Sequence, residues 1–307
     1  MKKQKNLKIK QITILSFIIN TLLIFSLQSQ IHIKSEYAYV NKESFKKIKL
    51  DSPEVQSLGY QVLNTDTLIK IENKYLEKFN AKRKRIRVPY EFKDSTFLDI
   101  YKNVVYRTHL TPKEKNKWRM KLWKDTLKVY FNNAVPKSHK QSLMKFADKV
   151  SKKVDSLNIV QVNDINDSNY IIYYIDDKTK IDYELAIENE RAGYYIRWDG
   201  AWITKCRLKI NTLSSLGDLE DMVLLKYYFF LSLGYFSYSN QITPKAYLSS
   251  SREISKLTEI DLEILKYHYS YGICKGTDLE TFEYQHRKMK ESLKENPNNK
   301  LYFSHSY

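Results

Sequence analysis

Hydrophobic and polar positions are most regularly ordered in the middle of the chain. Residues 127–135 (LKVYFNNAV) are rich in β-branched and aromatic side chains and end at a proline, which predicts a strand. Ser138 is expected to cap a helix whose apolar positions recur at spacings of three and four. These positions are Leu143, Phe146, Ala147, Val150, Val154 and Leu157. Residues 159–162 and 169–175 predict two further strands.

A second pair of strands is predicted on either side of a turn at Asp199 and Gly200. Residues 193–198 form the first, and residues 202–210 (WITKCRLKI) form the second, which alternates regularly. Trp202, Thr204, Cys206, Leu208 and Ile210 face one way, and Lys205, Arg207 and Lys209 face the other. A strand with one polar face suits the edge of a sheet, where lysines also deter unwanted pairing. We therefore expect residues 202–210 to be an edge strand.

Helices dominate the rest of the chain after this strand. Residues 218–233 are strongly apolar, with acidic residues in the first turn, and Gly234 is expected to end this helix. Thr258 and Asp261 form a capping box that opens a helix reaching about Tyr269. The order of strands and helices predicts an α+β core with one sheet over residues 118–276. Residues 277–307 are expected to form a charged helix and a polar tail.

The first third of the chain has a weaker pattern. Residues 31–117 are predicted to be an extension of helical or irregular structure, with helical periodicity near residues 68–79 and 97–106. Between these segments, a basic run from Lys82 to Arg87 is closed by Pro89. Such a run could contact a phosphate-rich surface, but a solvated linker is the more common explanation.

The N-terminus has the layout of a signal peptide. Five lysines precede an apolar run at residues 12–27 that no charge interrupts. We expect residues 1–30 to be a signal peptide, with an uncleaved membrane anchor as the alternative. No later stretch is long and apolar enough to span a membrane. The protein is therefore predicted to be exported, to a periplasmic, cell-surface or extracellular location.

The net charge refines this picture. The 307 residues carry a formal charge of +17, and removing the five lysines of the signal leaves about +12. For an exported protein, such a charge favours acidic lipids, wall polymers or acidic glycans over nucleic acid. The alternative is that lysine serves only as solubilising surface.

Two features within the 118–276 pattern carry a resemblance to a known family. The strongly apolar helix ends in Tyr227-Tyr-Phe-Phe-Leu-Ser-Leu-Gly234, and the closing helix has Leu257, Thr258, Asp261, Leu265 and Tyr269, with Gly272 just beyond. Together with the order of elements, they resemble the zincin-like fold of secreted metallopeptidases, more narrowly a matrixin-related group of exported bacterial domains of unknown function. The resemblance implies a packing helix, a mixed sheet with an edge strand, and a helix that carries His-Glu-x-x-His followed by x-x-Gly.

This chain departs from the family's metal motif at every catalytic position. Counting back from Gly234, Tyr227 and Leu231 occupy the two histidine positions and Tyr228 occupies the glutamate position, while Ser237 stands where the third ligand belongs. Leucine offers no lone pair, and neutral tyrosine and serine are poor zinc ligands. We therefore predict a non-catalytic protein without metal or other cofactor. An active metallopeptidase with unrecognised zinc ligands is the alternative.

Other catalytic sets are not evident in the sequence. The six histidines, His32, His109, His139, His268, His286 and His305, are scattered and form no ligand-spaced pair. Cys206 and Cys274 could form one disulfide in an oxidising compartment, or remain two isolated thiols. The strand position of Cys206 favours burial over nucleophilic catalysis.

Two functional classes follow for a non-catalytic exported domain: a binding module, or a structural component of the cell envelope. The resemblance implies that a substrate lies extended along the edge strand, and this geometry does not need the metal. Lys205, Arg207 and Lys209 would then favour an acidic extended peptide or envelope polymer. The alternative is that these side chains only protect the strand from aggregation. The sequence identifies no partner.

Overall fold

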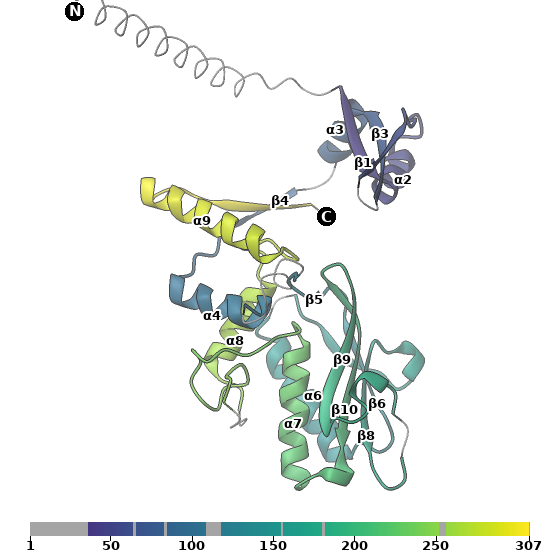
Figure 1. The fold of residues 1–307 in the computed structure, drawn as a ribbon, viewed down its shortest axis with the longest axis vertical. Coiled ribbons are helices and arrows are strands. Elements are labelled where there is room, and N and C mark those ends of the chain that lie inside the picture. Colours follow the sequence, from purple (N-terminus) through teal and green to yellow (C-terminus); the bar gives the residue numbers. More distant parts are fainter. Residues whose placement is uncertain are drawn as a thin grey trace, which may run out of the picture. The chain divides into compact units, whose positions relative to one another are not determined.

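The computed structural model describes residues 36–63, 66–82, 85–108, 118–154, 156–179, 182–251 and 256–306. The predicted signal peptide at residues 1–30 therefore lies outside the described residues. The chain divides into two compact units, Met1–Arg85 with Ser306–Tyr307 and Ile86–His305. Each unit is described by itself (Figure 1).

The small unit is a three-stranded sheet with two helices. Its elements are β1 (Tyr37–Asn41), α2 (Lys42–Asp51), β2 (Tyr60–Leu63), β3 (Asp66–Glu72) and α3 (Asn73–Lys82). β3 pairs antiparallel with β1 and β2, and the fully enclosed side chains are Val40, Ile48, Val55 and Ile71. The predicted helix at residues 68–79 is half wrong, because its first part is strand β3. Ile69 and Ile71 alternate toward the core there, so an apolar spacing of two was read as helical.

The large unit is built on a six-stranded mixed sheet. Its strands are β5 (Leu122–Trp123), β6 (Leu127–Phe131), β7 (Ile159–Gln161), β8 (Tyr170–Ile175), β9 (Ala192–Asp199) and β10 (Trp202–Asn211). β7, β6, β8 and β10 are parallel neighbours in that order, β5 pairs with the start of β10, and β9 pairs antiparallel with β10. Short 3₁₀ turns lie at Ile165–Asp167, Leu185–Ile187 and Thr212–Ser214.

Five helices and a two-stranded sheet complete the described part of this unit. They are α4 (Ser95–Tyr106), α6 (Lys137–Ser151), α7 (Asp218–Ser232), α8 (Glu259–Tyr269) and α9 (Leu279–Glu295), with β4 (Arg85–Pro89) paired to β11 (Tyr302–Ser306). The prediction of an α+β fold is confirmed. α6 begins at Lys137 behind Pro136 without a side-chain cap, so the predicted Ser138 cap is wrong. The capping box of Thr258 and Asp261 is present.

Helices α6 and α7 cover the same face of the sheet (Figure 1). His139 of α6 contacts Tyr174, and Phe229 of α7 contacts Tyr170, and these two tyrosines point the same way from β8. Their side chains join one large core with Leu143, Val150, Cys206, Leu208, Ile210 and Leu225.

α4 belongs to the large unit, although the sequence placed it in the N-terminal extension. Asp94 caps it by accepting a hydrogen bond from Phe97 N at 2.9 Å. Tyr101 then packs edge-on against Tyr267 of α8 and stacks with Phe282 of α9. The change between units consequently falls near residue 85 and not at residue 117.

The prediction that residues 202–210 form an edge strand is wrong. β10 pairs with β9 along one side and with β8 and β5 along the other, so it lies inside the sheet. The turn at Asp199 and Gly200 was expected, but the antiparallel strand that it adds takes the edge position. Alternation of polar and apolar residues reports that one face is polar and does not report how many neighbours a strand has.

Candidate functional site

The end of α7 is held by hydrogen bonds from two other elements. Its last carbonyls would otherwise lack partners, as at the C-terminus of any helix. Trp123 Nε1 donates to Ser232 O at 3.1 Å, and Tyr269 OH donates to Leu233 O at 2.6 Å. Trp123 N in turn donates to Tyr269 OH at 3.1 Å. α7, β5 and α8 are therefore tied together just before Gly234.

Gly234 is required by packing and not by a left-handed backbone. It follows α7 as expected, but the left-handed residue is Tyr235, with φ of 51°. A Cβ atom on Gly234 would lie 2.3 Å from the ring of Phe236, which is closer than any real contact. The glycine therefore lets the Phe236 ring fold back against the helix end.

The motif positions hold side chains that pack against each other. Tyr227 contacts Tyr228, with ring centroids 5.0 Å apart, and Leu231 is buried in the core. Ser237 is also buried, and its main-chain N donates to Val104 O at 2.9 Å. Burial, with a smaller effect from Tyr228, raises the pKa of Tyr227 to about 12, so its phenol is neutral at ordinary pH. These groups provide packing and offer no anionic ligand.

The part of the chain that the structure describes holds no cluster of metal-binding side chains. Within it, no three side chains of histidine, cysteine, aspartate or glutamate come together in a way that could hold a metal ion.

An aromatic and cationic cluster that the sequence analysis did not predict lies beside this helix end. The guanidinium of Arg107 lies 4.6 Å from the ring of Trp118 and 4.0 Å from that of Tyr235. Its Nη2 donates to Tyr235 O at 3.3 Å, while its buried Nε has no hydrogen-bond partner. Trp198 of β9 packs on the same Tyr235 ring at 5.5 Å. The cluster joins residues that are far apart in sequence, which is why no local pattern predicts it.

β9 presents unpaired main-chain groups at its outer side. Cys206 N donates to Asn169 O, on the β8 side of β10, and successive residues of a strand point to alternate sides. The main-chain N–H and C=O groups of Arg207 therefore point toward β9, and those of its partner Tyr195 point toward β10. The main-chain N–H and C=O groups of the intervening residues therefore point away from β10. These residues are Tyr194, Ile196 and Trp198. Among the described residues, β9 pairs with no strand except β10.

The three basic residues proposed for ligand binding lie on one face of β10 but in different environments. Lys205 is exposed, directly opposite exposed Arg197. Arg207 is half-buried, and its Nε donates to Tyr183 O at 3.2 Å. Lys209 is fully buried, 2.9 Å from Asp182 Oδ2, and also donates to the carbonyls of Ile187 and Glu188. Lys209 consequently has a structural contact and cannot meet a ligand.

Both cysteines are free in the structure. Cys206 lies in the core beneath α7, and burial raises the pKa of its thiol to about 12. A thiol with this pKa is protonated at neutral pH and is a poor nucleophile. Cys274 is half-buried, and burial raises the pKa of its thiol as well.

The described histidine side chains make separate contacts. His139 accepts or donates at Tyr174 OH (2.8 Å) and lies 2.9 Å from Asp218 Oδ1. His268 Nε2 donates to Lys121 O at 2.7 Å, so its Nδ1 accepts from Tyr101 OH. His286 lies between Tyr90 and Tyr267. Burial lowers the pKa of both His268 and His286 to about 4. The side chains of His32, His109 and His305 lie outside the described residues.

Two comparisons with known proteins gave no match. No protein-family model matches the chain, and no curated protein matches it significantly.

The length and apolar character of the helices decide whether they could span a membrane. None of those in the described ranges combines the length and the apolar character that crossing a bilayer requires.

Proposed function

We propose that the large unit is a non-catalytic, zincin-like module that binds an extended acidic peptide along the open edge of β9. The observation that carries this proposal is the outer side of β9, an eight-residue strand whose outward main-chain groups are unpaired among the described residues. Extended peptides bind such edges by adding a strand.

β9 has only part of the usual protection of an exposed edge. Natural edge strands are commonly short, or carry lysines, prolines or inward-pointing charges that prevent pairing. β9 carries one exposed cation, Arg197, and its pairing with β10 is irregular near Lys205, but it has neither lysine nor proline. It also exposes the rings of Tyr195 and Trp198. A long edge with exposed aromatic side chains favours pairing, so a dedicated ligand explains why it is left open.

The charges beside this edge favour an acidic ligand. Arg197 and Lys205 are paired residues of β9 and β10, and both are exposed on the face opposite to α7. Like charges directly across a sheet destabilise it unless an anion lies between them. A glutamate or aspartate on an added strand would lie beside Arg197 and relieve this repulsion.

The order of elements supports the zincin-like part of the proposal. The elements follow one another in the order that the resemblance implies: β6, α6, β7, β8, the β9–β10 hairpin, α7 and α8. Gly234 follows α7, and β9 forms an edge of the sheet. The edge strand is β9 in place of the expected residues 202–210. A peptide along β9 would pass Trp198 and the cluster around Arg107 near the former metal position.

Binding is tested with a short fluorescein-labelled peptide that alternates glutamate and valine. Fluorescence anisotropy should show saturable binding to the full chain, and lysine in place of glutamate should abolish it. N-methylation of alternate peptide nitrogens should also abolish binding, because it removes donors to the β9 carbonyls. Equal binding of the N-methylated peptide would contradict strand addition.

A pair of charge reversals separates the edge from the general positive charge. Arg197→Glu should weaken binding about tenfold or more, equivalent to about 1.4 kcal/mol. Lys128→Glu is the matched control, because Lys128 is an exposed cation on β6, on the same face, with β8 and β10 between it and β9. Equal losses in both variants would assign the binding to net charge. Peptide hydrolysis that a chelator abolishes would replace this proposal with a metallopeptidase.

The proposal also includes export, which rests on the lysines and the apolar run of residues 1–30. A tagged full-length chain should be recovered outside the cytoplasm. Recovery in the cytoplasm with an intact N-terminus would contradict export and leave the peptide-binding test unaffected.

A further inference from the structure

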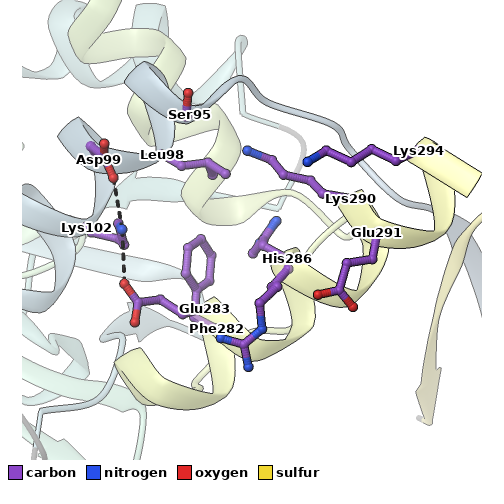
Figure 2. A pocket seen from close by; sticks show the side chains of 11 residues that line it. Ser95, Leu98, Asp99, Lys102, Phe282, Glu283, His286, Lys290, Glu291 and Lys294 are labelled. Atoms are coloured by element: carbon purple, nitrogen blue, oxygen red, sulfur yellow. Dashed lines mark hydrogen bonds and ion pairs between the residues drawn. The ribbon is translucent and has the colours of Figure 1, made fainter.

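A pocket of about 500 Å³ opens between α4 and α9 in the large unit (Figure 2). None of its lining residues belongs to β9. Its floor includes two buried side chains of α9, Phe282 and His286, and one of α4, Leu98. Charged side chains of both helices form its walls. They are Asp99 and Lys102 of α4 with Glu283, Arg287, Lys290, Glu291 and Lys294 of α9.

The carboxylates of this pocket already have cationic partners. Lys102 lies 2.9 Å from Asp99 Oδ1 and 3.0 Å from Glu283 Oε1, so one ammonium group serves two carboxylates (Figure 2). Glu291 is paired with Lys288, which does not line the pocket, at 2.9 Å.

Neither Lys290 nor Lys294 forms an ion pair among the described residues. After Lys288, which has the larger effect, Lys294 helps to lower the pKa of the Glu291 carboxyl, three residues before it, and the Lys290 ammonium lies 5.7 Å from the ring of Phe92. The two lysines lie one turn apart on α9, and Figure 2 shows both side chains running toward α4, near Ser95 and Leu98. Two like charges at this spacing repel each other. Lys290 is half-buried, so this repulsion is screened less than it would be between fully solvated groups.

His286 contributes no charge beside Lys290 and Lys294 at neutral pH. Its Nδ1 lies 2.8 Å from Tyr90 OH and its Nε2 lies 3.3 Å from Tyr267 OH, so both ring nitrogens have neutral partners. Burial, and then the positive charges of Lys290 and Lys102, lower its pKa to about 4. The positive charge of the pocket therefore comes from its lysines and Arg287.

We propose that the pocket between α4 and α9 binds a phosphate ester, with Lys290 and Lys294 as its cationic ligands. Ammonium groups are compact point charges that suit a phosphate dianion, and two of them match its two negative charges. At the other end, Asp99 and Glu283 have unused acceptor capacity because they share Lys102. The organic part of the ligand would therefore carry hydroxyl donors.

Calorimetric titration of the full chain tests this site with two probes, inorganic phosphate and glycerol 3-phosphate. Both should bind saturably, and glycerol 3-phosphate should bind more tightly because its hydroxyl groups reach the carboxylate end. The double variant Lys290→Gln/Lys294→Gln should lose about tenfold or more in affinity. Lys300→Gln is the control and should change the affinity less than about twofold, because Lys300 is an exposed cation that does not line the pocket.

A vesicle arm distinguishes a soluble ester from a lipid headgroup. Phosphatidylcholine vesicles with and without phosphatidic acid are sedimented with the chain, and the phosphatidylcholine sample reports any membrane binding by residues 12–27. Extra sedimentation with phosphatidic acid that the double variant loses assigns the site to a headgroup. Loss of soluble-probe affinity alone assigns it to a free ester. No saturable binding of any probe, or equal binding by the double variant and Lys300→Gln, would overturn the proposal, and neither result bears on the β9 edge.

Discussion

The two faces of the large sheet are covered in different ways, and strand β10 contributes to both. On one face, Cys206, Leu208 and Ile210 are at most 1% exposed beneath the helical layer. On the other, Lys205 is exposed while Lys209 is fully buried. The helical face is stabilised by apolar contact from Cys206 to Ile210, whereas the opposite face buries charge only where residues 182–188 supply partners. One alternating sequence pattern therefore gives three environments: core, ion pair and solvent.

The largest expected effect concerns the ion pair on the opposite face. Asp182→Asn leaves the Lys209 ammonium buried without its counter-ion, which costs about 3–5 kcal/mol in buried pairs. Lys209→Met should cost clearly less, because it removes the buried charge and leaves Asp182 partly exposed. Urea denaturation followed by tryptophan fluorescence measures both. Equal losses would show that the pair is not what stabilises this face.

Acid should separate the core around α8 from the ion pair of Lys209 and Asp182 by the pH at which each loses stability. Burial lowers the pKa of His268 to about 4, below its value of about 6.5 in an unfolded chain. Between these values the unfolded state binds the proton, so His268 lowers the stability by on the order of 3 kcal/mol as pH decreases from about 6.5 to 4. His286, whose pKa burial also lowers to about 4, adds to the same slope. Denaturation at several pH values should show this slope, and His268→Gln should reduce it. An unchanged slope in the variant would contradict the assignment.

Asp182 should respond only at lower pH. Burial alone would raise the pKa of this carboxyl, but hydrogen bonds from Tyr173 and Lys209 outweigh burial and lower it below 3.8. Its contribution is therefore complete above the unfolded value of about 3.9 and is lost as pH falls further. In the same titration, Asp182→Asn should leave the slope between pH 6.5 and 4 unchanged.

A smaller effect is expected at the link between α7 and α8. Tyr269→Phe keeps the ring and removes the hydroxyl that binds Leu233 O and Trp123 N. Leaving buried polar groups unpaired costs about 1–3 kcal/mol. Tyr284→Phe is the matched control, because the ring of Tyr284 is exposed. A loss below about 0.5 kcal/mol for Tyr269→Phe would show that water replaces the hydroxyl.

The smallest effect is expected at the solvated end of the opposite face. Lys205→Glu places a carboxylate across from Arg197 and should stabilise the unit by a few tenths of a kcal/mol. Lys205→Gln should give about half of this gain, because it removes the repulsion without adding attraction. Thermal denaturation measures both, and a loss above about 1 kcal/mol would contradict the solvated environment of Lys205.

Local signals in the sequence predicted the elements that depend on local chemistry. The capping box at Thr258 fixes the start of α8, and the spacing of Leu143 and Val150 identifies the buried face of α6. β3 was missed because Leu68, Ile69 and Ile71 fit a helical and an extended pattern equally well. Only pairing with β1 and β2, which the sequence does not show, decides between them.

The candidate sites depended on contacts between distant segments. Arg107, Trp118, Trp198 and Tyr235 meet only after α4, β9 and the end of α7 have packed. The α4–α9 pocket likewise joins residues near 95 and 290. The sequence identified the motif positions around Gly234, but it assigned the open edge to the wrong strand of the hairpin.

The spacing of the outward groups on β9 restricts what sequence a partner could have. Tyr194, Ile196 and Trp198 stand two residues apart, so an added strand repeats its contacts about every 6.6 Å. Alternate residues of that strand would face Arg197 and Tyr195, and the others would face Trp198 and α7. The preferred partner segment would then alternate acidic and apolar residues and contain no proline at a bonded position. Candidate partners can thus be ranked from their sequences before any of them is purified.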